Sequence, residues 1–94
     1  MTEEFPKNEL FGLISQFRRA AVSISNCIAE GSGSSSNKDY RNFLDIAVKS
    51  ALEIASMLFL AERLNYISLQ QKLDIYNQTE ILIKQIRAFK NSLK

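Results

Sequence analysis

The sequence predicts an all-α protein, an up-down antiparallel bundle of three long helices that assembles into a homo-oligomer. Three segments place apolar residues at intervals of three and four, and no segment alternates with period two for long enough to form a strand. Short connections favour antiparallel neighbours. The 94 residues, 46% of them hydrophobic, suffice for one domain, residues 1–94. Because three long rods leave much apolar surface uncovered, we expect part of it to be buried against other subunits.

The first helix is predicted over about residues 6–30. Pro6 suits a first helical turn, where its missing N–H costs nothing. An apolar stripe follows at helical spacing, made of Leu10, Ile14, Phe17, Ala21, Ile24 and Ile28. A second line holds small residues, which let a neighbouring helix axis approach closely: Ala20, Ser23, Cys27 and Gly31. We interpret this line, and a similar one at Ala47, Ala51 and Ala55, as helix packing rather than a binding site.

The second helix is predicted over about residues 37–64. Ser36 is a good N-cap, and Asp39 lies where a capping-box partner is needed. Its apolar residues form two stripes, Tyr40, Leu44, Ala47, Ala51, Ile54 and Leu58, and beside them Val48, Leu52, Ala55 and Phe59. A helix that is apolar over so wide an arc is expected to be buried on more than one side. Asn65 should end it, because asparagine tolerates the left-handed conformation.

The third helix is predicted over about residues 68–93. Ser68 and Gln71 have the spacing of a capping box. The apolar residues that follow are Leu69, Leu73, Tyr76, Ile83, Ile86 and Leu93. The only low-complexity stretch, the loop at Gly31–Ser36, is predicted to be flexible from its glycine and serine content.

The composition argues against an enzyme. The chain has no histidine and one cysteine, so one chain cannot build a zinc site of the usual Cys/His kind, and Cys27 has no histidine base to activate it. We expect Cys27 to be a small, buried, inert thiol. The segment GSGSSSNKD lacks the G-K-[ST] ending of a phosphate-binding loop and follows a helix instead of a strand. We therefore predict no catalytic residue, no cofactor and no metal.

The sequence also predicts a cytoplasmic location. The N-terminus MTEEFPKNE lacks the basic-then-apolar order of a secretion signal. The longest apolar stretch, Ile54–Ala61, is too short to span a bilayer, so no membrane partner is expected. A single cysteine fits a reducing compartment.

Clusters of basic residues indicate a partner, although the net charge is only +2. The predicted contacts to nucleic acid are Arg18, Arg19, Lys38, Arg41, Lys84, Arg87 and Lys90, with Lys94 at the end of the last cluster. These side chains could contact phosphates, or they could favour solubility and the helix macrodipole. In an oligomer each cluster repeats, which strengthens a weak patch. Since no recognition-helix or aromatic stacking motif is present, binding should be directed to shape and backbone.

Polar stripes run along the first two helices. The first contains Arg19, Ser23, Asn26 and Glu30, and the second contains Asp45, Lys49, Glu53 and Ser56. Glu30 and Glu53 could form a carboxylate pair that faces basic groups. We favour a structural ion-pair network instead, in which Lys49 pairs with Asp45 and Glu53 one helical turn away.

Several short motifs occur in a characteristic order. The first block holds F-P-x-x-E at Phe5–Glu9, G-L at Gly12–Leu13, Q-x-x-R-A at Gln16–Ala20, S-I at Ser23–Ile24 and I-A-E-G at Ile28–Gly31. The second holds I-A-x-x-S-x-x-E at Ile46–Glu53 and A-E-x-L-x-Y-I at Ala61–Ile67. In this order and spacing the chain resembles the bacterial four-helix-bundle proteins encoded within intervening sequences of 23S ribosomal RNA genes.

The resemblance implies a helical bundle that assembles into a ring, a pentamer, and a family polar motif at Arg19, Ser23, Glu30, Ser50 and Glu53. Related proteins are nucleic-acid-binding accessory factors of the reverse transcriptase of diversity-generating retroelements. Cys27 stands where the family usually has asparagine. The family also has a helix before the F-P motif, where this chain begins, so either that helix is missing or this member is a three-helix form. In both cases the apolar arc of the second helix should be under-covered.

These observations give two hypotheses for function. The first is a non-enzymatic oligomer that binds RNA or structured nucleic acid through backbone contacts. The second is a protein–protein scaffold or accessory subunit of a nucleic-acid enzyme such as a reverse transcriptase.

Overall fold

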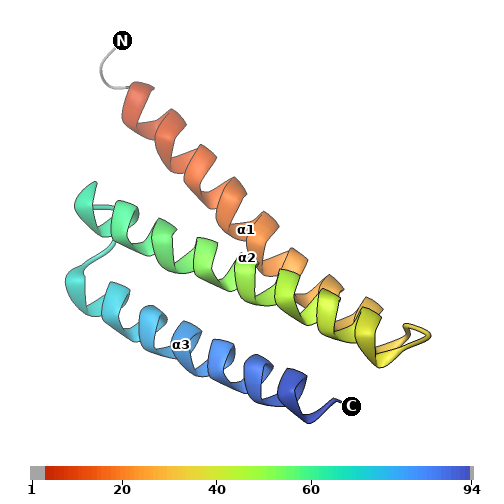
Figure 1. Cartoon of the computed structure of the whole chain (residues 1–94). Helices are drawn as coiled ribbons and strands as arrows, with labels where there is room; N and C mark the ends of the chain where they lie inside the picture. The colour runs from red at the N-terminus through yellow and green to blue at the C-terminus, as the bar shows by residue number, and fades with distance from the viewer. Residues whose placement is uncertain (1–3, 94) are drawn as a thin grey trace.

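The described part of the chain consists of three α-helices. A computed structural model describes residues 4–93, with side chains from Leu10 onward, and places α1 at Glu4–Ser32, α2 at Asn37–Arg63 and α3 at Leu69–Ser92 (Figure 1). No strand occurs within the described residues. The all-α prediction is confirmed, and the predicted helix ends agree with the observed ones to within two residues. Pro6 lies in the first turn of α1, as expected.

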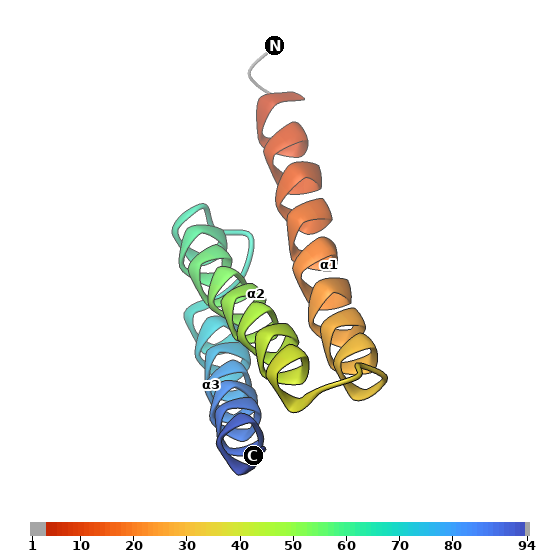
Figure 2. The ribbon, with the colours of Figure 1, turned by 45° about the vertical axis from the view of Figure 1, so that its right-hand side comes forward.

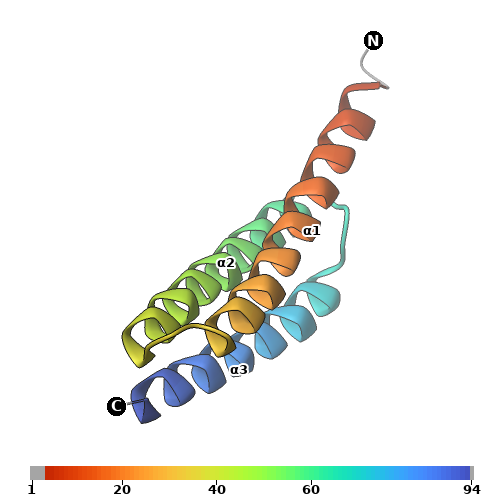
Figure 3. The same cartoon turned by 90° about the vertical axis from the view of Figure 1, so that its right-hand side faces the viewer.

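The helix α2 lies between α1 and α3 and packs against both (Figures 1 and 2). Neighbouring helices run antiparallel, so the loop between α1 and α2 lies at the same end of the molecule as the end of α3 (Figure 3). The N-terminal half of α1 diverges from α2 (Figure 2). The Cα atoms extend over 54 × 24 × 13 Å. Among the described elements, α2 is covered by α1 on one side and by α3 on another.

The line of small residues on α1 forms the contact with α2. Ala20 and Cys27 of α1 are buried, and Ala47 and Ala51 of α2 are 0% exposed. This confirms the packing role predicted for the small residues and the buried position of Cys27. By contrast Ile14, in the predicted apolar stripe of α1, is 38% exposed. Ile24, of the same stripe, is 7% exposed, so a larger residue also takes part in the contact where the two helices lie close together. Ile14 is exposed because it lies in the part of α1 that diverges from α2.

The apolar arc of α2 is only partly covered. Leu44 and Val48 are buried, but Leu52 is 48% exposed and Phe59 is 51% exposed. As expected, α2 is buried on more than one side, because it packs against α1 on one face and against α3 on another. The expected under-coverage of the apolar arc is confirmed at Leu52 and Phe59.

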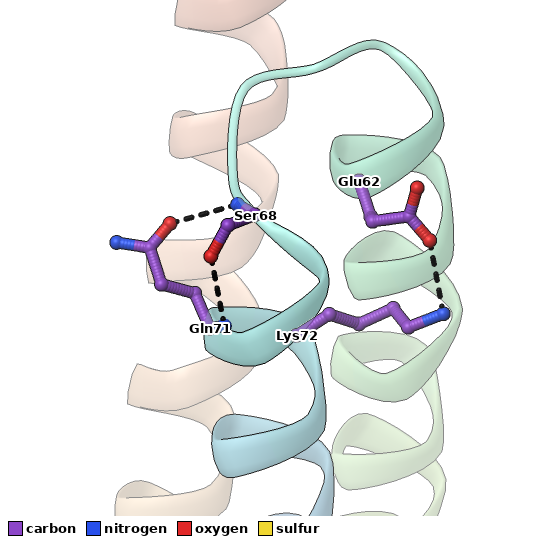
Figure 4. A network of polar contacts seen from close by, with 4 residues as sticks. All are labelled: Glu62, Ser68, Gln71 and Lys72. Atoms are coloured by element: carbon purple, nitrogen blue, oxygen red, sulfur yellow. Dashed lines mark hydrogen bonds and ion pairs between the residues drawn. The ribbon is translucent and has the colours of Figure 1, made fainter.

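Local signals at the ends of α2 and α3 take the predicted form. Asn65 has φ 63°, and the N–H groups of Asn65 and Tyr66 donate to the carbonyls of Glu62 (3.0 Å) and Ala61 (2.9 Å), the two bonds of a Schellman motif. Ser68 and Gln71 form a complete capping box: Gln71 N–H donates to Ser68 Oγ (3.1 Å), and Ser68 N–H donates to Gln71 Oε1 (2.8 Å) (Figure 4).

The predicted capping box at the start of α2 forms only in half. The Asp39 N–H donates to Ser36 Oγ at 3.1 Å, which confirms Ser36 as the N-cap. Within the described residues the Asp39 carboxylate makes no return bond to the Ser36 N–H. Aspartate is one methylene shorter than the Glu or Gln of a usual capping box, which reduces its reach.

Candidate functional site

Two of the predicted basic contacts hold α3 against α2. Arg41 Nη1 donates to the Leu93 carbonyl at 3.1 Å, and Lys90 Nζ lies 2.6 Å from Asp45 Oδ1. A T-shaped contact between Tyr40 and Phe89, with ring centroids 5.3 Å apart, adds to the same junction. The side chains of Arg41 and Lys90 therefore already have partners inside the chain.

The other five predicted contacts are exposed: Arg18, Arg19, Lys38, Lys84 and Arg87. Within residues 10–93, none of these five side chains makes an ion pair or a hydrogen bond. They do not form one patch, because α2 separates Arg18 and Arg19 on α1 from Lys84 and Arg87 on α3. Lys94 lies outside the described residues.

A crevice between α1 and α2 brings together most of the family polar motif. Four of its five residues, Arg19, Ser23, Ser50 and Glu53, line this cavity of about 670 Å³. We call it the polar crevice, and its other lining residues are Gln16, Ala20, Ile46, Lys49, Ser56 and Met57. Glu30, the fifth member of the motif, is not among the lining residues, so the suggested pairing of Glu30 with Glu53 does not occur there.

A hydrogen bond between the helices fixes the floor of the polar crevice. Ser50 Oγ donates to Ser23 Oγ at 3.0 Å, and Ser50 is only 7% exposed. The Ser23 hydroxyl lies 4.0 Å from Cys27 Sγ, one turn along α1. Small residues such as Ala20 line the crevice together with the longer, exposed side chains of Arg19, Lys49 and Glu53.

The predicted ion-pair network of Lys49 is wrong. Asp45 pairs instead with Lys90 of α3. In the described part of the chain, neither Lys49 nor Glu53 makes an ion pair. Lysine placed one turn before glutamate is the less favourable order for such a pair. Gln16 was not predicted to join the polar stripe of α1, although its spacing from Arg19 and Ser23 puts it on the same face of the helix.

A second, apolar groove lies where α1 diverges from α2. It measures about 320 Å³ and is lined by residues of all three helices and the α2–α3 loop, among them Leu13, Phe17, Met57, Ile67 and Ile75. Lys72 and Glu62 join α3 to α2 near this end, with Lys72 Nζ 3.1 Å from Glu62 Oε1 (Figure 4).

The described residues provide neither a metal site nor a membrane-spanning helix. Among the described residues, no group of three or more His, Cys, Asp or Glu side chains is placed to hold a metal ion. None of the described helices combines the length and apolar character needed to cross a membrane.

The sequence profile of the 23S rRNA-intervening sequence protein family matches residues 1–88, which include the whole polar crevice. The chain belongs to this family. Comparison with curated proteins and with solved structures gives no match. Membership of the 23S rRNA-intervening sequence protein family thus confirms the resemblance carried by the motifs, and the polar crevice is where most of the polar motif residues meet.

Proposed function

We propose that this 23S rRNA-intervening sequence protein is a non-enzymatic homo-oligomer that binds RNA or structured nucleic acid through backbone contacts. The observation that carries the proposal is the set of five exposed basic side chains without partners among the described residues. Side chains of this kind are free to neutralise phosphates, which supplies most of the affinity in backbone-directed binding. A cytoplasmic location fits this role.

Assembly into a ring, a pentamer in our proposal, would strengthen such binding. Large apolar side chains are exposed on all three helices, including Phe11 on α1, Phe59 on α2 and Ile81 on α3. Exposed apolar surface of this extent favours a protein interface. In a closed ring each basic cluster recurs once per subunit, and the summed field attracts a polyanion more strongly than one chain does.

The test is fluorescence anisotropy with a labelled RNA hairpin at two salt concentrations, with duplex DNA as a second ligand. We expect binding that weakens steeply with salt, since each phosphate contact contributes a slope of about 0.7–0.9. A variant with Arg18, Lys38 and Arg87 all changed to Gln should bind every RNA sequence more weakly and show a flatter slope. Failure of the wild-type protein to bind RNA at low salt would reject the proposal.

The alternative is a protein–protein scaffold or accessory subunit of a nucleic-acid enzyme such as a reverse transcriptase. The apolar groove at the divergent end of α1 favours it, because a groove lined by Leu13, Phe17 and Ile75 suits an apolar segment of a partner. A stoichiometric protein partner recovered together with the chain, without salt-dependent RNA binding, would favour this function over the first.

A further inference from the structure

We infer that the polar crevice binds one ribonucleotide unit, with Arg19 and Lys49 on the phosphate and Glu53 accepting a hydrogen bond from the ribose 2′-hydroxyl. The inference rests on the proposed function for its choice of a nucleotide as ligand. It adds a defined site between α1 and α2 and a preference for RNA over DNA.

Opposite charges line the polar crevice without pairing among the described residues. Arg19, Lys49 and Glu53 all line the polar crevice, yet within residues 10–93 no ion pair or hydrogen bond engages any of their side chains. Their summed charge is +1 at neutral pH, which attracts an anion. Arginine also offers two parallel N–H donors that match a phosphate.

The carboxylate of Glu53 limits which anions the polar crevice can bind. A carboxylate in an anion site repels a bare phosphate or sulfate, so the site is not built for an inorganic anion. A ligand that carries a donor beside its phosphate turns this repulsion into a hydrogen bond. A ribonucleotide has such a donor in its 2′-hydroxyl, and this group is what lets a protein tell RNA from DNA.

The size and lining of the polar crevice also suit a nucleotide. Its volume of about 670 Å³ lies within the usual range of about 300–1,000 Å³ for small-molecule sites. The hydrogen bond between Ser50 and Ser23 holds the two walls at a fixed separation. Ile46, which is 47% exposed, and Met57 offer apolar surface to a sugar or a base on the α2 side.

Three crevice variants and two matched controls test the inference on a labelled RNA hairpin and the DNA hairpin of the same sequence. Arg19→Gln and Lys49→Gln should each weaken RNA binding about tenfold and reduce the salt slope by about 0.7. The matched control Arg63→Gln removes the same charge from the exposed end of α2 and should change affinity less than about twofold. Glu53→Ala should lower the ratio of RNA to DNA affinity about tenfold without weakening DNA binding, because a single hydrogen bond to a charged group is lost.

Asp74→Ala serves as the control for Glu53→Ala. It also removes one negative charge, but from α3, where the Asp74 carboxylate accepts a hydrogen bond from Gln70 and does not line the polar crevice. This variant should leave the ratio of RNA to DNA affinity unchanged. Circular dichroism melting of each variant checks that the fold is intact.

The outcomes separate this inference from the proposed function. If the wild-type protein binds RNA but Arg19→Gln and Lys49→Gln behave like Arg63→Gln, the polar crevice is not the site and the proposed function stands. If Glu53→Ala leaves the ratio of RNA to DNA affinity unchanged, recognition of the 2′-hydroxyl is rejected. If the crevice variants dissociate the oligomer in sedimentation velocity while their RNA affinity is unchanged, the crevice is a subunit contact and the inference is overturned.

If the wild-type protein binds no RNA, a second experiment tests the crevice with free nucleotides. Adenosine 5′-monophosphate and its 2′-deoxy counterpart are then titrated into isotope-labelled protein by nuclear magnetic resonance. Shifts of the Ser23, Ser50 and Glu53 amides that are larger with the ribonucleotide would support a free nucleotide as ligand and reject the proposed function alone. The absence of shifts would overturn both.

Discussion

At the scale of single residues, the two described glycines of α1 have opposite surroundings. A Cβ atom on Gly31 would lie 2.6 Å from Cδ1 and 2.9 Å from Cε1 of Tyr40, and 3.1 Å from Cβ of Phe43. The Tyr40 ring cannot move freely, because it also packs against Phe89. A Cβ on Gly12 would meet no atom within 4 Å. The glycine of the I-A-E-G motif is therefore required by the close approach of α2, and the glycine of the G-L motif is not.

The first prediction is that Gly31→Ala destabilises the protein whereas Gly12→Ala does not. Overpacking at Gly31 should cost about 1–3 kcal/mol of unfolding free energy. At Gly12, alanine should raise the unfolding free energy by about 0.5–1 kcal/mol, because it restricts the unfolded chain and favours the helix. Urea unfolding of both variants measures the difference. Equal midpoints for the two variants would contradict the close packing at Gly31.

The second prediction concerns the hydrogen bond from Ser50 to Ser23. Because Ser50 is buried, Ser23→Ala leaves its hydroxyl without an acceptor and should cost about 1–3 kcal/mol. The double variant Ser23→Ala, Ser50→Ala removes both polar groups and should cost less than the sum of the two single variants. A double-mutant cycle by urea unfolding measures this coupling, for which we expect about 1 kcal/mol. Additive single effects would show that the two hydroxyls do not interact in solution.

At the scale of helices, the ends were predictable and the contact faces were less so. Asn65, Ser68 and Gln71 act through bonds to backbone groups a few residues away, so their spacing in the sequence is enough to predict them. The face of α1 that meets α2 depends on a tertiary neighbour. Periodicity predicted one apolar stripe along α1, but its residues differ in burial: Ile24 is 7% exposed and Ile14 is 38% exposed. The divergence of α1 from α2, which decides this difference, cannot be predicted from periodicity.

The third prediction compares the two N-caps. Ser68→Ala combined with Gln71→Ala should cost about 1–2 kcal/mol, because together they remove both side-chain acceptors of the capping box at the start of α3. Ser36→Ala should cost less, about 0.5–1 kcal/mol, because only one side-chain bond is lost at the start of α2. Urea unfolding of both variants measures the two costs. A larger loss for Ser36→Ala than for the double variant would mean that the reciprocal bond from Gln71 adds nothing.

At the scale of the whole molecule, the antiparallel order of the helices decides how the polar residues combine. The sequence predicted which residues are polar and which motif they belong to. It could not predict that Lys90 of α3 would pair with Asp45, which leaves Lys49 and Glu53 without an ion pair among the described residues. The polar crevice joins residues far apart in the chain, Arg19 and Glu53 among them, and the same topology separates the basic clusters on α1 and α3. Such groupings depend on how helices pack, which local patterns do not specify.

The fourth prediction follows from the exposed apolar side chains of this thin molecule. Leu52 and Ile81 expose apolar surface on α2 and α3. A chain of this length buries only a small hydrophobic core. If another subunit covers that surface, dissociation and unfolding are coupled, and the melting temperature rises with protein concentration. We expect this rise for the wild-type protein, together with sedimentation as an oligomer.

A pair of charge-adding variants tests whether these apolar side chains are the cause. Leu52→Lys with Ile81→Lys should give a monomer whose melting temperature no longer depends on concentration, since two buried charges in an interface cost more than the contact gains. Ser25→Lys adds a charge at an exposed polar position of α1 and should leave the assembly intact. A wild-type melting temperature that is constant over a hundredfold range of concentration would mean that the monomer is stable with its apolar surface in water. The ring, and the repetition of the basic clusters that it provides, would then have to be abandoned, and any RNA binding would have to come from a single chain.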